Sequence, residues 1–215
     1  AERTLILCPR SVMGVWPKQF ATHSERQYHV VVLRRPDGGD LSVPGKRKAA
    51  EQAAADALAL GLPLALICNY DSAWRAPLAA WLVNQEWDCL ISDESHRHKA
   101  GTSKISQFMA ALRPSARLRL ALTGTPYGDR PLDLFGQFRF LDPALFGHAF
   151  TPFRDRYAIM DPYVTGKVAR YKNLDQLHDI FYSVAYHADE SVVELPERTH
   201  TTVSVPFEKD ARRRY

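Results

Sequence analysis

The sequence predicts an α/β protein with a mostly parallel β-sheet, helices on both faces of the sheet and a helical appendage toward the C-terminus. From residue 4 to residue 122, short apolar runs alternate with helix-like segments, which is the pattern of a parallel sheet with crossover helices. The run Cys89-Leu90-Ile91 is continuously apolar, as in strands covered on both faces. Four of the runs end in polar clusters, and ligands bind at the carboxyl ends of strands in such sheets.

The elements of the first half follow from apolar runs, caps and helix breakers. Ser11 is a candidate cap for a helix over residues 11–20, although Pro17 should kink that helix or delay its start. Residues 34–47 contain several prolines and glycines and are expected to form a loop, whereas the alanine-rich residues 49–60 are expected to be helical. The predicted strands are 4–8, 29–33, 62–68, 89–92 and 118–122, and the other predicted helices are 71–84 and 104–112.

The pattern changes after residue 130. The prediction is helix for 131–140, 152–159 and 173–182, irregular structure for 161–172, short strands for 184–186 and 199–205, and the start of a basic helix at 209–215. We interpret this half as part of the same lobe, with a lobe over residues 1–147 and its extension over residues 148–215. Because a strand begins almost at the first residue, the sequence is expected to be a fragment of a longer chain.

Composition narrows the class of protein only broadly. The chain has 215 residues, of which 46% are apolar, and this is enough for a sizeable core. Its net charge of +4 is compatible with a polyanionic partner without requiring one. Cys8, Cys68 and Cys89 adjoin apolar runs at spacings that no zinc site uses, so we expect buried, reduced thiols of a cytosolic protein. No apolar run approaches the length of a membrane span, and no membrane partner is expected.

The most informative stretch is Asp93-Glu94-Ser95-His96, in which two adjacent carboxylates follow a buried strand. At a strand end the first carboxylate can hold Mg²⁺ on nucleotide phosphates, and the second can orient or deprotonate an attacking water molecule. An isolated Asp-Glu pair is more often a solvated strand end. The functional interpretation therefore depends on the other clusters.

Three further polar clusters follow predicted strands: Pro9-Arg10-Ser11, Asn69-Tyr70 and Thr123-Gly124-Thr125-Pro126. Because the carboxyl ends of parallel strands share one edge, the four clusters are expected to form one functional face. Backbone amides, hydroxyls and an arginine suit phosphate contacts, which position a nucleic acid without reading its sequence. The alternatives are that Arg10 is an ordinary surface charge and that Thr123 belongs to a capped turn.

In this order the clusters resemble the first RecA-like lobe of helicase superfamily two, and specifically the Swi/Snf-type DNA translocases. They match motifs Ia, Ib, II and III of that lobe, with Trp16 and Phe20 following motif Ia. The resemblance continues through Lys99 and residues 103–106, through Phe140-Leu141-Asp142-Pro143-Ala144-Leu145-Phe146-Gly147, and through residues 195–199. Each motif is weak alone, but the ordered set spans nearly the whole chain.

The resemblance implies an ATP-driven motor that acts on DNA. It assigns Asp93 to Mg²⁺ and Glu94 to the attacking water, and it implies that His96 links the nucleotide to motif III through Thr123 or Thr125, which flank Gly124. The alternative for His96 is a histidine packed beneath the sheet edge. The residues implied to face the nucleic acid are Pro9, Arg10, Ser11, Asn69, Tyr70 and Lys99.

The ligands implied by the resemblance are ATP and Mg²⁺. The implied partners are DNA, double-stranded and bound independently of sequence, and a second helicase lobe of the full-length protein. The resemblance places such a protein in the cytoplasm or nucleoid of a bacterium or in the nucleus of a eukaryote.

The sequence also departs from the family pattern. Ser95 stands where alanine is usual, and Tyr127-Gly128-Asp129 stands where Leu-Gln-Asn is common. The phosphate-binding loop Gly-x-x-x-x-Gly-Lys-Ser/Thr does not occur in residues 1–215, because Gly45-Lys46 is followed by Arg47 and has Asp40 in place of the first glycine. Lys46 is expected to lie in a loop, and this fragment alone is not expected to hydrolyse ATP.

Two alternative functions stay open. One is an unwinding or restriction-type motor of superfamily two, against which the 140–147 segment argues. The other is a non-hydrolytic nucleic-acid-binding or scaffold module, against which the intact Asp93-Glu94 pair argues. The basic run of Arg97, His98, Lys99 and Lys104 either extends the nucleic-acid face or forms a solvated loop.

Overall fold

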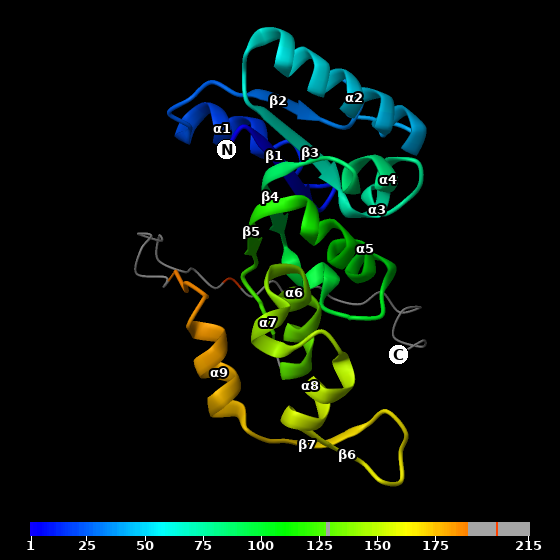
Figure 1. Ribbon diagram of the computed structural model, residues 1–215, viewed down its shortest axis with the longest axis vertical. Coiled ribbons are helices and arrows are strands. Elements are labelled where there is room, and N and C mark those ends of the chain that lie inside the picture. The colour runs from blue at the N-terminus through cyan, green and yellow to red at the C-terminus, as the bar shows by residue number, and fades with distance from the viewer. Residues whose placement is uncertain (128–129, 189–200, 202–215) are drawn as a thin grey trace. The chain divides into compact units, whose positions relative to one another are not determined.

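The computed structural model of the chain describes residues 1–127, 130–188 and 201 (Figure 1). It divides the chain into two units, Ala1–Ile180 and Phe181–Tyr215. Within the second unit, residues 184–186 have no regular structure, so the strand predicted there is wrong. The strand predicted at 199–205 and the helix predicted at 209–215 lie outside the described residues, apart from Thr201.

The first unit contains a sheet in which all neighbouring strands are parallel, in the order β2-β3-β1-β4-β5. The predicted parallel α/β fold is therefore confirmed, and each of the five strands predicted between residues 4 and 122 is present with its ends shifted by only a few residues. The strands are β1 (Arg3–Cys8), β2 (His29–Val32), β3 (Leu64–Asn69), β4 (Trp87–Asp93) and β5 (Ala116–Leu122).

Helical segments connect the strands of this sheet. They are α1 (Trp16–His23), α2 (Val43–Leu60), α3 (Tyr70–Ala73), α4 (Leu78–Val83), η1 (Ser95–His98) and α5 (Lys104–Leu112). The single helix predicted over 71–84 is wrong, because the chain forms α3 and α4 with a break between them. No helix in the described part of the chain is long and apolar enough to cross a membrane.

The starts of α1 and α2 differ from the prediction for physical reasons. The helix α1 begins at Trp16 instead of residue 11, because Pro17 is tolerated only in the first turn of a helix. Ser11 is therefore not its cap, and residues 10–15 form turns. The helix α2 begins at Val43, where the Ser42 hydroxyl accepts a hydrogen bond from the amide of Gly45 (3.2 Å). Residues 43–47 are thus helical and not part of a loop.

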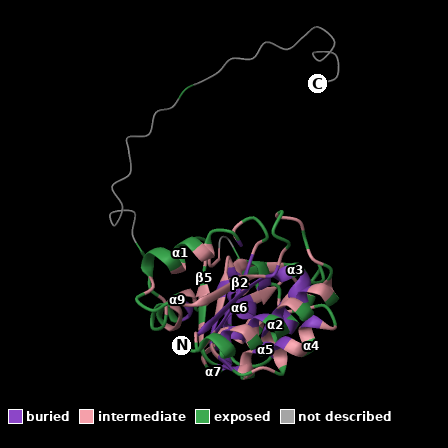
Figure 2. Cartoon of the chain, turned by 90° about the horizontal axis from the view of Figure 1, so that it is seen from above, coloured by how far each residue is buried: buried purple, intermediate pink, exposed green. Residues whose placement is uncertain are grey.

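Side chains of β1 alternate between two cores, one on each face of the sheet. Leu5 and Leu7 belong to the larger core, to which α2, α4, α5 and the later helix α6 (Leu134–Leu141) contribute. Ile6 and Cys8 belong to the smaller core, which α1 covers. Figure 2 shows the buried residues concentrated in the sheet and on the inner sides of its helices. Helices cover both faces of the sheet, as predicted.

The three cysteines are free, buried thiols, as expected. Burial raises the pKa of the Cys8 thiol to about 12, with a further contribution from the Asp93 charge. Burial also raises the pKa of Cys68 to about 12. Both thiols therefore stay protonated at neutral pH and act as packing groups.

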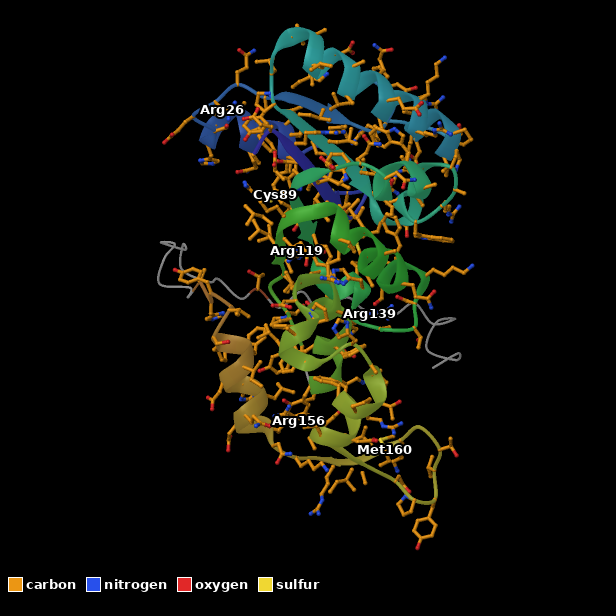
Figure 3. All side chains as sticks on the ribbon, in the orientation of Figure 1. Arg26, Cys89, Arg119, Arg139, Arg156 and Met160 are labelled. Carbon is orange, nitrogen blue, oxygen red and sulfur yellow. The ribbon has the colours of Figure 1, made fainter. Side chains whose placement is uncertain are left out.

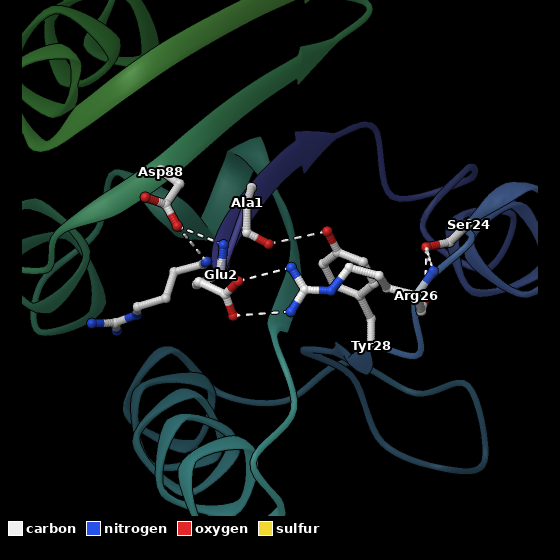
Figure 4. Close-up of polar contacts among 7 residues, drawn as sticks. Ala1, Glu2, Ser24, Arg26, Tyr28 and Asp88 are labelled. Carbon is white, nitrogen blue, oxygen red and sulfur yellow. Dashed lines mark hydrogen bonds and ion pairs between the residues drawn. The ribbon is translucent and has the colours of Figure 1, made fainter.

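Polar contacts with distant segments fix the amino end of β1 (Figure 4). The Asp88 carboxylate accepts hydrogen bonds from the backbone amides of Glu2 (2.6 Å) and Arg3 (3.0 Å), and these bonds lower the pKa of Asp88. Arg26 pairs with the Glu2 carboxylate at 2.8 Å. The contacts hold β1 against β4 at the end opposite to the polar clusters.

After β5 the chain forms a small helical layer and a hairpin. The elements are η3 (Pro131–Asp133), α6 (Leu134–Leu141), α7 (Pro143–Phe146), α8 (Phe150–Tyr157), β6 (Ala158–Met160), β7 (Val168–Tyr171) and α9 (Leu174–Tyr182). The strands β6 and β7 pair antiparallel, so the irregular structure predicted over 161–172 is wrong in part. Gly166 has a φ of +80°, which allows the turn between them.

The helix α6 is joined to the sheet region by two arginines, which Figure 3 labels. Arg119 of β5 donates from Nε to the carbonyl of Leu141 at the end of α6 (2.7 Å). Arg139 of α6 donates from Nη1 to the carbonyl of Gly101 (3.0 Å). A cluster of aromatic rings packs the far side of α6 against α7 and α8, comprising Phe135, Phe138, Phe146, Phe153 and Tyr157.

Candidate functional site

The four polar clusters lie at one edge of the sheet, as predicted. Cys8 at the end of β1 is opposite Asn69 of β3, and Asp93 of β4 is opposite Leu122 of β5. The residues that follow these strand ends therefore come from four neighbouring strands, β3, β1, β4 and β5. This shared edge is the candidate functional site.

Glu94 has a left-handed backbone conformation, with φ 53° and ψ 54°. For a residue with a side chain this costs on the order of 1 kcal/mol, and it persists where the surrounding structure imposes it. The Tyr70 hydroxyl donates a hydrogen bond to the carbonyl oxygen of Asp93 (2.7 Å), and the buried Ser95 hydroxyl donates one to Gln137 (2.7 Å). Both neighbours of Glu94 are thus held, and the Glu94 side chain extends from the edge with 43% of its surface exposed.

His96 joins the second carboxylate to the turn after β5. Its Nδ1 lies 3.2 Å from the Glu94 carboxylate and 3.2 Å from the Thr123 hydroxyl. The Thr123 hydroxyl in turn accepts a hydrogen bond from the amide of Thr125 (3.1 Å). The predicted contact of His96 with Thr123 is therefore present. Gly124 and Thr125 are exposed beside this contact, and they make the turn accessible from solvent.

The Asp93 carboxylate accepts a hydrogen bond at Oδ2 from the indole nitrogen of Trp16 (3.2 Å). Trp16 opens α1 and packs on the smaller core, so this bond joins the segment that follows β1 to the end of β4. Within the described residues no group of three or more acidic, histidine or cysteine side chains gathers as a complete metal cage. The single, partly buried Asp93 carboxylate nevertheless fits Mg²⁺, because this ion commonly takes one or two carboxylates and completes its shell with phosphates and water.

The exposed cations of the edge differ in how strongly they are engaged. The Arg10 guanidinium lies 3.8 Å from Asp40 and keeps 61% of its side chain exposed. Lys99 pairs with Asp133 at 2.7 Å and is 47% exposed. His98 is fully buried, so the run from 97 to 99 is not a continuous basic face. Pro9 and Ser11 lie beside Arg10 at the end of β1, and Ser11 is exposed.

Asn69 and Tyr70 lie at the edge, but their side chains are turned inward, with 3% and 1% exposed. The Tyr70 hydroxyl contacts the Ser92 hydroxyl as well as the Asp93 carbonyl, and burial raises the pKa of Tyr70 so that it stays protonated. Such side chains present almost no surface to a nucleic acid. The placement therefore argues against the predicted direct contact, and it gives both residues an internal role in shaping the edge.

The expectation that Lys46 lies in a loop is wrong. Lys46 lies in the first turn of α2, its side chain is fully buried, and its ammonium has three partners. These partners are Asp40 (2.6 Å), Asn69 Oδ1 (2.6 Å) and the Ser72 hydroxyl (2.8 Å). Burial opposes ionisation of Asp40, but the hydrogen bond and charge of Lys46, together with Arg10, lower the pKa of Asp40. A chain of polar contacts thus runs from Arg10 to Asn69 through a buried charge.

Three residues of the site were not identified from the sequence as polar partners: Lys46, Trp16 and Gln137. Each carried a weak signal. Lys46 is the first of three consecutive basic residues before the alanine-rich segment, Trp16 follows motif Ia closely, and Gln137 is a polar residue among the apolar residues of α6. None of these signals names the partner, because the contacts join residues that are far apart in the chain.

Known proteins resemble this chain in sequence and in fold. The sequence is 30% identical over 134 residues to the human DNA annealing helicase and endonuclease ZRANB3, an alignment covering 59% of this chain and 12% of that protein. It is 28% identical over 167 residues to the CHD3-type chromatin-remodeling factor PICKLE of Arabidopsis thaliana, covering 66% of this chain and 11% of that protein. The chain thus spans only about one-ninth to one-eighth of the length of these relatives.

The fold is similar to solved structures as well. The SWI2/SNF2 ATPase core of Sulfolobus solfataricus in complex with dsDNA superposes with a TM-score of 0.57 at 22% identity, covering 85% of this chain and 32% of that one. The same core domain solved by itself gives a TM-score of 0.57 at 22% identity and covers 91% of this chain. Finally, the sequence model of the SNF2-related domain matches residues 1–215, and the chain therefore belongs to that family.

Proposed function

We propose that this chain is part of the first motor lobe of an ATP-dependent, double-stranded DNA translocase. The observation that carries the proposal is the contact series from Glu94 through His96 to Thr123 at the carboxyl edge of a parallel sheet. In a motor, the residues that bind the nucleotide must be coupled to the residues that bind the DNA. This series provides such a connection within hydrogen-bond distance, and membership of the SNF2-related domain family supports it.

On the nucleotide side, we assign Asp93 to holding Mg²⁺ and Glu94 to orienting the attacking water. Mg²⁺ bound with ATP would neutralise phosphate charge during transfer. The indole of Trp16 keeps the Asp93 carboxylate in one orientation, and the constrained backbone of Glu94 directs the second carboxylate out of the edge. His96 Nδ1 lies 3.2 Å from both the Glu94 carboxylate and the Thr123 hydroxyl, so a hydrogen on Nδ1 can be shared between these two oxygens.

On the nucleic-acid side, we assign Pro9, Arg10, Ser11 and Lys99 to backbone contacts with DNA. Arg10 is mostly exposed and only weakly paired with Asp40, so a phosphate can compete for it. The Asp133 carboxylate already engages Lys99, so its contribution depends on that pair opening. Contacts of this kind hold the backbone without reading bases, which suits movement along any sequence.

The proposal also includes a second lobe in the full-length protein, which would close on the nucleotide from the other side. Closure of two lobes around ATP is a general way to complete such a site and to shift the grip on a ligand. Because the proposed activity requires DNA, the protein would act in the nucleus of a eukaryote or the nucleoid of a bacterium.

The test is ATP hydrolysis by the full-length protein with duplex DNA, with single-stranded DNA and without DNA. We expect stimulation mainly by duplex. Glu94→Gln, which keeps size and hydrogen bonding but removes the base, should reduce the rate at least about 100-fold. Stimulation mainly by single strands would favour an unwinding motor. DNA binding without hydrolysis would leave a binding or scaffold module and overturn the proposal.

A further inference from the structure

Gln137 is a buried polar residue in an otherwise apolar helix. Its side chain belongs to α6, is 3% exposed and lies among buried phenylalanines of the same helix. Burying an amide without partners is unfavourable by roughly 1 to 3 kcal/mol, so a buried glutamine is expected to be hydrogen-bonded. Here every polar atom of the side chain has a partner.

The partners of Gln137 come from two different parts of the candidate site. Its Oε1 accepts a hydrogen bond from the Ser95 hydroxyl (2.7 Å), directly after Glu94. Its Nε2 donates to the carbonyl of Pro126 (2.5 Å), directly after Thr125, and more weakly to the carbonyl of Asp133 (3.3 Å). The orientation of the amide follows from chemistry, because the two carbonyl oxygens require the NH₂ group on their side.

The backbone contact beside Gln137 leaves α6 little room to move. A Cβ on Gly136 would lie 2.2 Å from the carbonyl oxygen of His98 and 2.4 Å from that of Lys99, so only glycine permits this approach. The Arg139 side chain also donates to the carbonyl of Gly101. The helix therefore lies directly against the segment that follows Glu94, and a shift of α6 must move that segment.

We propose that Gln137 is a positioning residue that couples the Asp93–His96 segment to the Thr123–Pro126 turn from the buried side of the edge. It acts in parallel with the His96–Thr123 contact on the exposed side, so that the two segments are joined twice. The Ser95 hydroxyl is the other half of the link. The expected consequence for activity rests on the proposed motor function, whereas the link itself does not.

The link is tested by hydrogen exchange in the full-length protein, without nucleotide or DNA. The variant Ser95→Ala removes one buried hydroxyl that has a partner. The matched control Ser106→Ala removes a buried hydroxyl of α5 that has no hydrogen-bond partner among the described residues. We expect the amides of Thr123, Gly124, Thr125 and Tyr127, which flank Pro126, to exchange about fivefold faster in Ser95→Ala, the size expected for losing one neutral hydrogen bond. They should be unchanged in Ser106→Ala.

A kinetic cycle tests the consequence for activity. Ser95→Ala, Gln137→Met and the double variant should each reduce DNA-stimulated kcat about 10-fold, with the KM for ATP within about twofold of the wild type. The double variant should be no worse than either single variant, because either one breaks the same link. Equal exchange at 123–127 in Ser95→Ala and Ser106→Ala would overturn the proposal even if the protein is a motor. Absence of ATP hydrolysis in the wild type would overturn the motor function and leave the exchange result standing.

Discussion

Two adjacent carboxylates have different surroundings at the edge of the sheet. Asp93 receives the indole N–H of Trp16, whereas Glu94 lies beside His96 and has a left-handed backbone. Neighbouring groups that differ in this way can take different roles in one reaction. At the scale of single residues, the arrangement therefore favours a metal-holding Asp93 and a water-orienting Glu94.

Removal of the indole donor should weaken the metal site. In the full-length protein, Trp16→Phe keeps an aromatic ring on the smaller core but removes the N–H at Asp93. We expect the Mg²⁺ concentration for half-maximal ADP binding to rise about 10-fold, as for other groups that orient a metal ligand. Calorimetric titration at several Mg²⁺ concentrations measures this. Trp81→Phe is the control, because Trp81 packs against Trp87 away from the edge, and an equal rise in both variants would contradict the role of Trp16.

His98 should make stability depend on pH. Burial lowers the pKa of His98 from its ordinary 6.5 to about 4, and its Nε2 contacts the Ser92 hydroxyl (2.7 Å). Between pH 6.5 and about pH 4, His98 binds a proton in the unfolded chain but not in the folded chain. The free energy of unfolding is therefore highest above pH 6.5 and falls as the pH drops toward 4. The loss should be on the order of 3 kcal/mol.

Urea unfolding at a series of pH values measures this effect. His98→Gln should lose most of the pH dependence in that window, whereas His23→Gln, at an exposed position in α1, should keep it. If His98→Gln and the wild type lose stability in parallel, another group is responsible.

At the scale of elements, the start of α2 depends on a buried charge. Lys46→Met keeps a long, unbranched side chain but leaves Asp40, Asn69 and Ser72 without their shared donor. We expect a loss on the order of 3 kcal/mol in the free energy of unfolding, because one partner of a buried pair is removed. Lys48→Met is the matched control on the exposed side of the same helix and should change stability by less than about 0.5 kcal/mol. Denaturant titration compares the two variants, and similar stabilities would contradict a structural role for Lys46.

The elements also show what the sequence could and could not predict. Five short apolar runs predicted the strands, and the order of polar clusters predicted the shared edge. The start of α2 was missed because Pro44 and Gly45 indicate a loop by composition, although proline is favourable in the first turn of a helix. The contact between Trp16 and Asp93 joins residues 77 positions apart, and that between Ser95 and Gln137 joins residues 42 positions apart. Such pairs depend on strand order and helix placement, which local patterns do not determine.

At the scale of the whole molecule, the proposed function requires more than binding and hydrolysis. A translocase must convert ATP turnover into movement along intact duplex. At the carboxyl edge of the sheet, His96 joins Glu94 to Thr123 on the exposed side, and Gln137 joins Ser95 to Pro126 on the buried side. A movement of the residues that bind the nucleotide can therefore be transmitted to the turn after β5 through two separate sets of contacts.

The most direct test is displacement of a third strand from a DNA triplex by the full-length protein. A motor that moves along duplex should release the third strand only with ATP, while the two duplex strands stay paired. Glu94→Gln should slow the release at least about 100-fold. Hydrolysis without release of the third strand, or separation of the duplex strands themselves, would contradict the proposed translocase.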